Sequence, residues 1–178
     1  MRRLMLLRHG KSDWPAGVPD ERRPLAERGR SASKTMAQHM IDCGLLPDHV
    51  LVSPAVRTLQ TWEIVGTKLA TATVVPEADM RPAIYDADAA QVLAEVRTVP
   101  DDKHSVLLVG HNPGLEDLTR LLCHGGDALA LSRIKVKFPT AALAVIDLGS
   151  SHWSEVGEGS GQLARFDTPR SITDAAKS

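Results

Sequence analysis

Short apolar runs alternate with helix-like stretches along this chain, and the alternation limits the fold to a few classes. The apolar runs are rich in Val, Leu and Ile, as strands buried on both faces of a sheet are. They are Leu4–Leu7, Val50–Val52, Val74–Val75, Val106–Val109 and Leu143–Ile146. Helical spacing or cap residues mark the stretches Ser31–Cys43, Pro54–Leu69, Ala87–Arg97 and Pro113–Cys123. This order predicts an α/β fold with a mostly parallel central sheet and helices on both faces.

The remaining segments complete the expected organisation. Leu143–Asp147 and His152–Val156 are separated by a Gly-Ser turn, which predicts an antiparallel edge hairpin near the C-terminus. The stretch Gly10–Pro24 is rich in Pro, Gly and charge and is expected to form a loop. The tail Thr168–Ser178 is polar and is expected to fray. A chain of 178 residues favours a single domain over residues 1–178.

Charge and cysteine content exclude several function classes. Twenty-one basic against 22 acidic residues give a net charge of −1, without the basic surplus of nucleic-acid or membrane-surface proteins. The apolar run after Arg3 is too short for a secretion signal, and no run reaches membrane-spanning length. Cys43 and Cys123 have no CxxC spacing, so neither a zinc site nor a disulfide framework is indicated. We expect a soluble, cytoplasmic protein; its oligomeric state stays open.

Reactive or cationic side chains follow three of the expected strands. They lie in Arg8–Gly10, Ser53–Arg57 and Gly110–Pro113. Parallel strands bring their carboxyl ends to one edge of the sheet, where ligands of open α/β folds bind. Two arginines, two histidines and two helix starts would then converge on one small volume, which suits a phosphoryl group.

Two histidines can do different work at such a site. A neutral imidazole can attack phosphorus and carry the phosphoryl group, provided that its other nitrogen donates to a fixed acceptor. A second, protonated imidazole can donate to a phosphoryl oxygen and stabilise the transition state. His9 and His111 are the candidates for these two roles.

At these motifs the chain resembles the histidine phosphatase (phosphoglycerate mutase-like) superfamily, most closely the SixA-type phosphohistidine phosphatases. The resemblance runs from Leu4 to about Val156. It rests on four segments in the expected order: Leu7–Ser12 (LRHGKS), Arg23–Leu25 (RPL) with Gly29 following, Val52–Thr61 (VSPAVRTLQT) and Val109–Glu116 (VGHNPGLE), together with Ile84–Ala87 (IYDA).

The resemblance implies roles for individual residues. His9 would be the nucleophile, and Arg8 and Arg57 would bind the phosphoryl oxygens. His111 would be the charge-stabilising histidine. The resemblance places Ser12 and Asn112 at the rim of the pocket, as substrate-binding residues. It implies no metal and no cofactor. The partner that it implies is a phosphorylated protein or a small phosphate compound.

One departure from the family pattern concerns the leaving group. Many members carry a carboxylic acid that protonates a leaving alkoxide, within a longer mid-chain insertion. The short stretch Pro76–Asp88 offers four carboxylates without a clear match: Glu77, Asp79, Asp86 and Asp88. Asp86 has two possible roles at this point: it could be the general acid, or it could be a negative charge at the N-terminus of the helical stretch Ala87–Arg97. A phosphohistidine nitrogen can be protonated by solvent beforehand, so the missing acid favours a P–N substrate.

Two alternatives to a phosphohistidine phosphatase remain at this point. One is a small-molecule phosphomonoesterase on the same scaffold. The other is a phosphate-binding module without turnover, which four intact core residues argue against. A labelled phosphoenzyme would separate an enzyme from a binding module.

Overall fold

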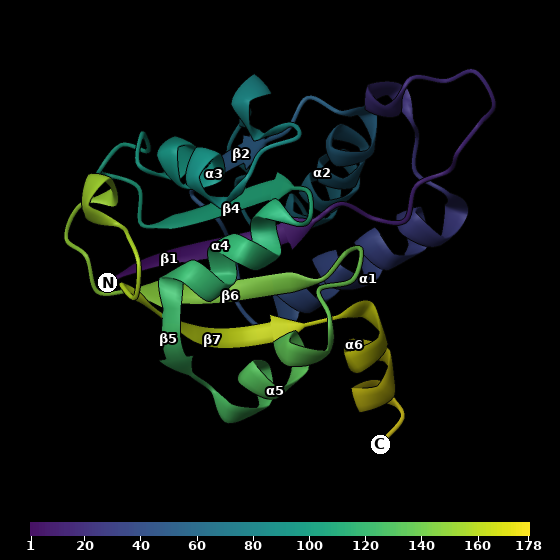
Figure 1. Cartoon of the computed structure of the whole chain (residues 1–178). Helices are drawn as coiled ribbons and strands as arrows, with labels where there is room; N and C mark the ends of the chain where they lie inside the picture. Colours follow the sequence, from purple (N-terminus) through teal and green to yellow (C-terminus); the bar gives the residue numbers. More distant parts are fainter.

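A seven-stranded sheet with the strand order β3-β2-β4-β1-β6-β7-β5 forms the centre of the molecule (Figure 1). The computed structural model describes all residues, 1–178. The strands are β1 (Arg2–Arg8), β2 (His49–Val52), β3 (Ala78–Met80), β4 (Ser105–Gly110), β5 (Cys123–Gly126), β6 (Leu143–Leu148) and β7 (Gly161–Asp167). Every neighbouring pair is parallel except the two pairs that β6 makes, with β1 and with β7. The mostly parallel sheet and the antiparallel pair near the C-terminus are therefore confirmed.

Six helices cover the two faces of the sheet. They are α1 (Glu27–Asp42), α2 (Val56–Leu69), α3 (Ala89–Val96), α4 (Gly114–Leu122), α5 (Ala128–Val136) and α6 (Pro169–Ala176). Side chains of β1 alternate between the faces: Leu4 and Leu6 pack with α3, α4 and α5, whereas Met5 and Leu7 pack with α1 and α2. Both sets are fully buried. Two apolar layers thus enclose the strand that leads to His9.

The sequence predicts two strands at positions where the structure has none. Val74–Val75 is not a strand, and Val74 is 93% exposed; the edge strand is β3, which pairs with Val50–Val52 of β2. The second strand of the antiparallel pair near the C-terminus is β7, and His152–Val156 holds a short 3-10 helix instead of a strand. Its Trp153 is buried and donates from Nε1 to the Lys103 carbonyl at 2.8 Å. The apolar character of that segment therefore reflects an anchored turn.

Three elements were not expected from the sequence. Strand β5 follows α4 directly, and its Gly125 and Gly126 pair with β7. Helix α5 has no strong apolar stripe, and its N-cap Asp127 accepts from the Ala130 backbone N–H. Helix α6 lies within the tail that was expected to fray. None of the helices is both long and apolar enough to cross a membrane.

Candidate active site

The carboxyl ends of β1, β2 and β4 meet beside the loop that leads into β6. The parallel register pairs Arg8 with Gly110 and Val52 with Val109, which brings the three motif segments to one edge. Because β6 is antiparallel, its start lies at the same edge, and the Ala141 backbone N–H donates to the Arg8 carbonyl at 3.0 Å. A cavity of about 250 Å³ opens there. It is lined by Arg8, His9, Lys11, Ser12, Trp14, Arg23, Arg57, His111, Asn112 and Thr140.

His9 is held in the tautomer that a nucleophile needs. Its Nδ1 lies 2.7 Å from the Gly10 carbonyl oxygen, which can only accept, so Nδ1 carries the proton and Nε2 presents its lone pair. The Gly10 N–H donates to Thr61 Oγ1 at 3.0 Å. A Cβ at Gly10 would lie 2.6 Å from the Gly29 carbonyl oxygen, so only glycine allows this close approach. Burial, with smaller effects from His111 and the two arginines, lowers the His9 pKa to about 3.

The two arginines reach the cavity from different elements. Arg8 ends β1 and donates from Nη1 to the Phe138 carbonyl at 2.9 Å, while Arg57 lies in the first turn of α2. Nε of each guanidinium is buried without a hydrogen-bond partner. Burial lowers the Arg8 pKa from its usual value. An anion between the two side chains would satisfy donors that are otherwise costly to bury.

His111 follows β4 and faces His9, with ring centroids 5.3 Å apart. The Ser53 hydroxyl lies 2.7 Å from Nε2 of His111, and when it donates there the neutral ring carries its proton on Nδ1. That Nδ1 is buried and has no partner. Burial, followed by the charge of Arg57, lowers the His111 pKa to about 4. At neutral pH the His111 ring is therefore neutral in the free protein, and a bound dianion would raise the pKa of this ring.

Ser53 has a different role from the one predicted. The sequence predicts Ser53 as the N-cap of a helix that starts at Pro54, but α2 starts at Val56 and its N-cap is Ala55. The Ser53 hydroxyl is directed to His111 instead. The N-cap prediction was wrong because a short hydroxyl can bond either a helix start or a neighbouring side chain.

The two rim residues line the cavity but have partners within the protein. Ser12 Oγ accepts from Arg23 Nη2 at 2.5 Å. Asn112 donates from Nδ2 to the Phe138 carbonyl at 3.0 Å, and its Oδ1 accepts from the Glu116 N–H at 3.2 Å. Asn112 thereby fastens the start of α4 and the loop that also holds Arg8. The helix begins at Gly114, one residue later than expected.

Sequence reasoning missed a cluster of hydrogen bonds around one carboxylate, that of Asp20, on the loop before α1. Asp20 accepts from Arg57 through its backbone carbonyl at 2.7 Å and through Oδ2 at 3.1 Å. Its carboxylate also accepts from Arg23 Nη1 at 2.9 Å and from the Tyr85 hydroxyl at 2.5 Å. The hydrogen bond from Tyr85, with those from the two arginines, holds the Asp20 pKa well below its usual range. The only sequence signal is that Asp20 and Arg23 share the charged loop.

The four mid-chain carboxylates do not line the cavity. Asp88 is the N-cap of α3 and forms a capping box with Gln91, and Asp79 pairs with Arg81 at 2.9 Å. Asp86 has a φ of 50° and makes no side-chain hydrogen bond. The helix N-terminal charge that Asp86 was considered for therefore belongs to Asp88.

The two low histidine pKa values predict a stability that falls with acidification. Between pH 6.5 and about 4 the unfolded chain takes up protons at His9 and His111 that the folded protein does not, so stability decreases as pH falls. Each group contributes up to about 1.4 kcal/mol per pH unit within its window. Thermal unfolding in phosphate-free buffer would measure the slope. His111→Gln is expected to reduce that slope, whereas replacement of the exposed His104 by Gln is expected to leave it unchanged.

The Asp20 contact predicts an effect on anion binding. In Asp20→Asn the backbone carbonyl of residue 20 still accepts from Arg57 Nη1, but the negative charge beside the Arg57 guanidinium is removed. Inorganic phosphate, measured as a competitive inhibitor, is expected to bind roughly two- to tenfold more tightly. Glu21→Gln alters the neighbouring carboxylate, which makes no ion pair, and is the control. Weaker phosphate binding in Asp20→Asn would show that the carboxylate mainly positions Arg57.

Comparisons with known proteins show the family of this chain. The family model of the histidine phosphatase superfamily (branch 1) matches residues 4–87. The phosphohistidine phosphatase SixA of Escherichia coli is 31% identical over 83% of this chain and 86% of its own length. A solved structure of the protein histidine phosphatase SixA with tungstate is similar, with a TM-score of 0.76 and 27% identity over 96% of this chain and 99% of that one. Another, assigned to a SixA phosphohistidine phosphatase from Nakamurella multipartitia, gives a TM-score of 0.79 and 25% identity over 94% and 96%.

Proposed function

The chain belongs to the histidine phosphatase superfamily and is a phosphatase, and from that premise we propose that it hydrolyses phosphohistidine in proteins through a phosphoenzyme on His9. The observation that carries the proposal is the set of buried, unpaired nitrogens around His9. Arg8 Nε, at the end of β1, Arg57 Nε, in the first turn of α2, and His111 Nδ1, just after β4, have no partner. Together they supply donors for the oxygens of one phosphoryl group.

In the first step His9 Nε2 attacks phosphorus. The new bond is Nε2–P, and the bond from phosphorus to the leaving imidazole nitrogen breaks. Arg8 and Arg57 bind the equatorial oxygens, and His111, protonated when the dianion raises its pKa, donates from Nδ1. The Gly10 carbonyl, which accepts from Nδ1 of His9, stabilises the cation that this ring becomes.

In the second step water attacks the phosphoenzyme. The water oxygen bonds to phosphorus, the bond from His9 Nε2 to phosphorus breaks, and both protons of the water leave with inorganic phosphate as H2PO4−. A neutral imidazole is released, ready for the next cycle, because the low pKa keeps His9 unprotonated at neutral pH. We propose that Arg8, Arg57 and His111 supply the positive charge that metal ions supply in other phosphatases, so that neither step needs a metal or another cofactor.

The leaving group is the basis for preferring a P–N substrate. None of the four mid-chain carboxylates lines the cavity, and Asp20, paired with two arginines, has a pKa too low to donate a proton at neutral pH. An alkoxide needs such a donor, whereas the nitrogen of phosphohistidine can be protonated before it leaves. The phosphomonoesterase alternative would need an acid from elsewhere.

A substrate panel tests this proposal. A phosphohistidine protein, an aryl phosphate and common sugar phosphates are compared at equal concentration, with trapping of the labelled phosphoenzyme. We expect the phosphohistidine protein to be hydrolysed fastest and the sugar phosphates least. Fast turnover of an aliphatic phosphomonoester would favour the alternative, and binding without a labelled enzyme would favour a non-catalytic module.

We also propose that residues 1–178 act as one domain, because the cavity is lined by residues from the first strand to the loop before β6. A cytoplasmic location is proposed as well, since both cysteines are free and a reducing compartment suits them.

A further inference from the structure

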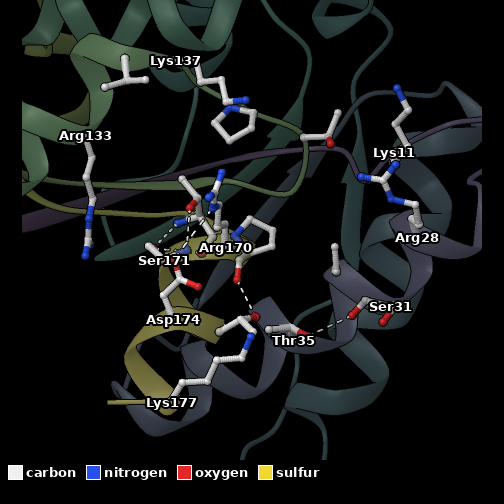
Figure 2. Close-up of a pocket in the computed structure, with 17 residues that line it drawn as sticks. Lys11, Arg28, Ser31, Thr35, Arg133, Lys137, Arg170, Ser171, Asp174 and Lys177 are labelled. Carbon is white, nitrogen blue, oxygen red and sulfur yellow. Dashed lines mark hydrogen bonds and ion pairs between the residues drawn. The ribbon is translucent and has the colours of Figure 1, made fainter.

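A second, larger groove of about 830 Å³ lies beside the nucleophile cavity. Its walls come from α1, from α5 with the segment that follows it, and from α6 (Figure 2). Lys11 and Thr140 line both the groove and the cavity at His9. A ligand in the groove would therefore lie next to a phosphoryl group at His9.

The groove concentrates positive charge. Six of the 21 basic residues line it, with only one of the 22 acidic residues, Asp174, although the whole chain carries a net charge of −1. The six are Lys11, Arg28, Arg133, Lys137, Arg170 and Lys177. In Figure 2 they surround the groove from several sides. This distribution produces a positive field beside the active site.

Most of these charges are not neutralised within the protein. Arg133 pairs with Asp167 at 3.4 Å, and Arg170 approaches Asp174 only to 3.9 Å. The remaining four make no ion pair: Lys11, Arg28, Lys137 and Lys177. The positive charge is thus available to a ligand.

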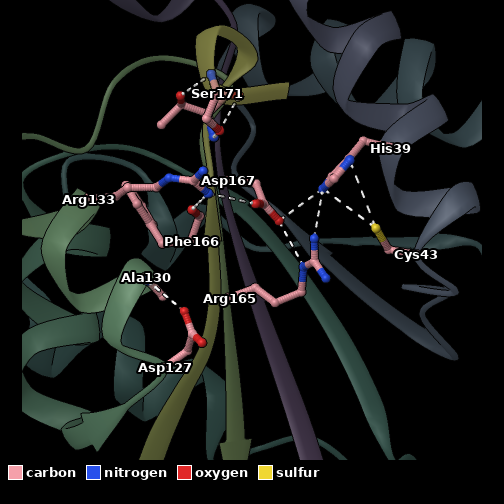
Figure 3. Close-up of polar contacts among 10 residues, drawn as sticks. His39, Cys43, Asp127, Ala130, Arg133, Arg165, Phe166, Asp167 and Ser171 are labelled. Atoms are coloured by element: carbon pink, nitrogen blue, oxygen red, sulfur yellow. Dashed lines mark hydrogen bonds and ion pairs between the residues drawn. The ribbon is translucent and has the colours of Figure 1, made fainter. Parts of the chain in front are cut away.

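The α6 wall is fixed to the rest of the fold. Asp167, directly before the N-cap of α6, is buried and accepts from Arg165 Nε at 2.9 Å (Figure 3). His39 of α1 lies 3.0 Å from the same carboxylate. Thr168 and Ser171 form a capping box that starts the helix. The groove therefore has walls anchored to α1 and β7.

We propose that this groove docks an acidic segment of the phosphoprotein whose phosphohistidine reaches His9. The inference rests on the proposed function and names the kind of partner that the site accepts. Only two of the 17 lining residues are hydrophobic and six carry positive charge, so charge is the main feature by which the groove can recognise a partner. Positive charges dispersed over several flexible side chains can attract carboxylates that are distributed along a protein surface. Such attraction guides the encounter of the two proteins and their orientation.

Two peptides of about twenty residues test the proposal, since an extended chain of that length can span both cavities. Each carries one histidine that is phosphorylated with phosphoramidate, flanked by glutamates in one peptide and by glutamines in the other. We expect kcat/KM to be about tenfold higher for the acidic peptide at low salt. This preference is expected to vanish at about 0.5 M NaCl, where screening is strong.

The matched variants locate the effect. Arg28→Glu/Lys177→Glu reverses two exposed, unpaired charges outside the nucleophile cavity and is expected to erase the preference. Hydrolysis of phosphoramidate itself is expected to stay within about twofold, which also shows that the variant is folded. Lys34→Glu changes an exposed charge on α1 that does not line the groove, and it is expected to retain the preference.

Several results would overturn the docking role. One is an equal kcat/KM of the wild type for the two peptides. Another is a preference for the acidic peptide that persists in the Arg28→Glu/Lys177→Glu variant. Inhibition by tripolyphosphate that the double reversal abolishes, without any peptide preference, would assign the groove to a small polyanion. If neither peptide is hydrolysed while an aryl phosphate is, the proposed function fails together with the docking role. Hydrolysis of both peptides at one rate refutes the groove alone.

Discussion

Replacing His9 by alanine is expected to abolish turnover while the fold stays intact. The side chain stands at the end of β1 and lines the cavity, so its loss removes the attacking nitrogen without opening the apolar core. Only the hydrogen bond to the Gly10 carbonyl is lost from the local structure, at about 1 kcal/mol. Removing a nucleophile costs on the order of a thousandfold or more in kcat. The measurement is hydrolysis of a phosphohistidine peptide, with trapping of the phosphoenzyme.

The control for His9→Ala is the same substitution at His104, an exposed histidine that does not line the cavity. That variant is expected to keep full activity and to form the phosphoenzyme. Thermal unfolding of both variants separates loss of chemistry from loss of fold. Substantial turnover by folded His9→Ala would refute the phosphohistidine mechanism, because no other group in the cavity is assigned as nucleophile.

Changing Arg57 to lysine is expected to reduce kcat about a hundredfold to a thousandfold, although the charge is kept. Nε of Arg57 is buried without a hydrogen-bond partner, while the two Nη atoms of the same guanidinium hold Asp20. A lysine has one nitrogen and cannot do both. Because the phosphoryl group spreads negative charge over three oxygens in the transition state, loss of the planar donor affects kcat more than KM.

Arg22→Lys is the matched control for Arg57→Lys, because Arg22 is exposed on the same loop as Asp20 and does not line the cavity. It is expected to behave like the wild type. The split between kcat and KM, together with the melting temperature, distinguishes a missing donor from a general loosening. Equal activity of Arg57→Lys and wild type would place Arg57 outside the catalytic machinery.

The strands at the centre of the sheet could be predicted from the sequence because apolar runs buried on both faces allow few other structures. Leu4–Leu7, Val50–Val52 and Val106–Val109 all lie within strands that end at the cavity. The six site residues could be brought together for the same reason, since parallel strands fix which ends are neighbours. The structure places all six around one cavity, and their chemical roles stay predictions.

Elements at the edge of the sheet were harder to predict because their patterns depend on distant contacts. Strand β5 reads Cys-His-Gly-Gly, which has no strand propensity, and it exists through its pairing with β7. Helix α6 is polar, and its start depends on the Thr168 capping box and on Asp167. The role of Asp20 was equally hidden, because a loop carboxylate shows no pattern that points to an arginine 37 residues later.

The central position of β1 has a consequence for folding kinetics. Met5 pairs with Leu107 on one side and with Val145 on the other, so the strand that leads to His9 is completed only by contacts distant in sequence. Closing such long loops makes folding slow relative to proteins of local topology. A partly folded chain without β4 or β6 therefore has no phosphate site. Phosphatase activity recovered during refolding should consequently appear with the slowest structural phase, and no earlier.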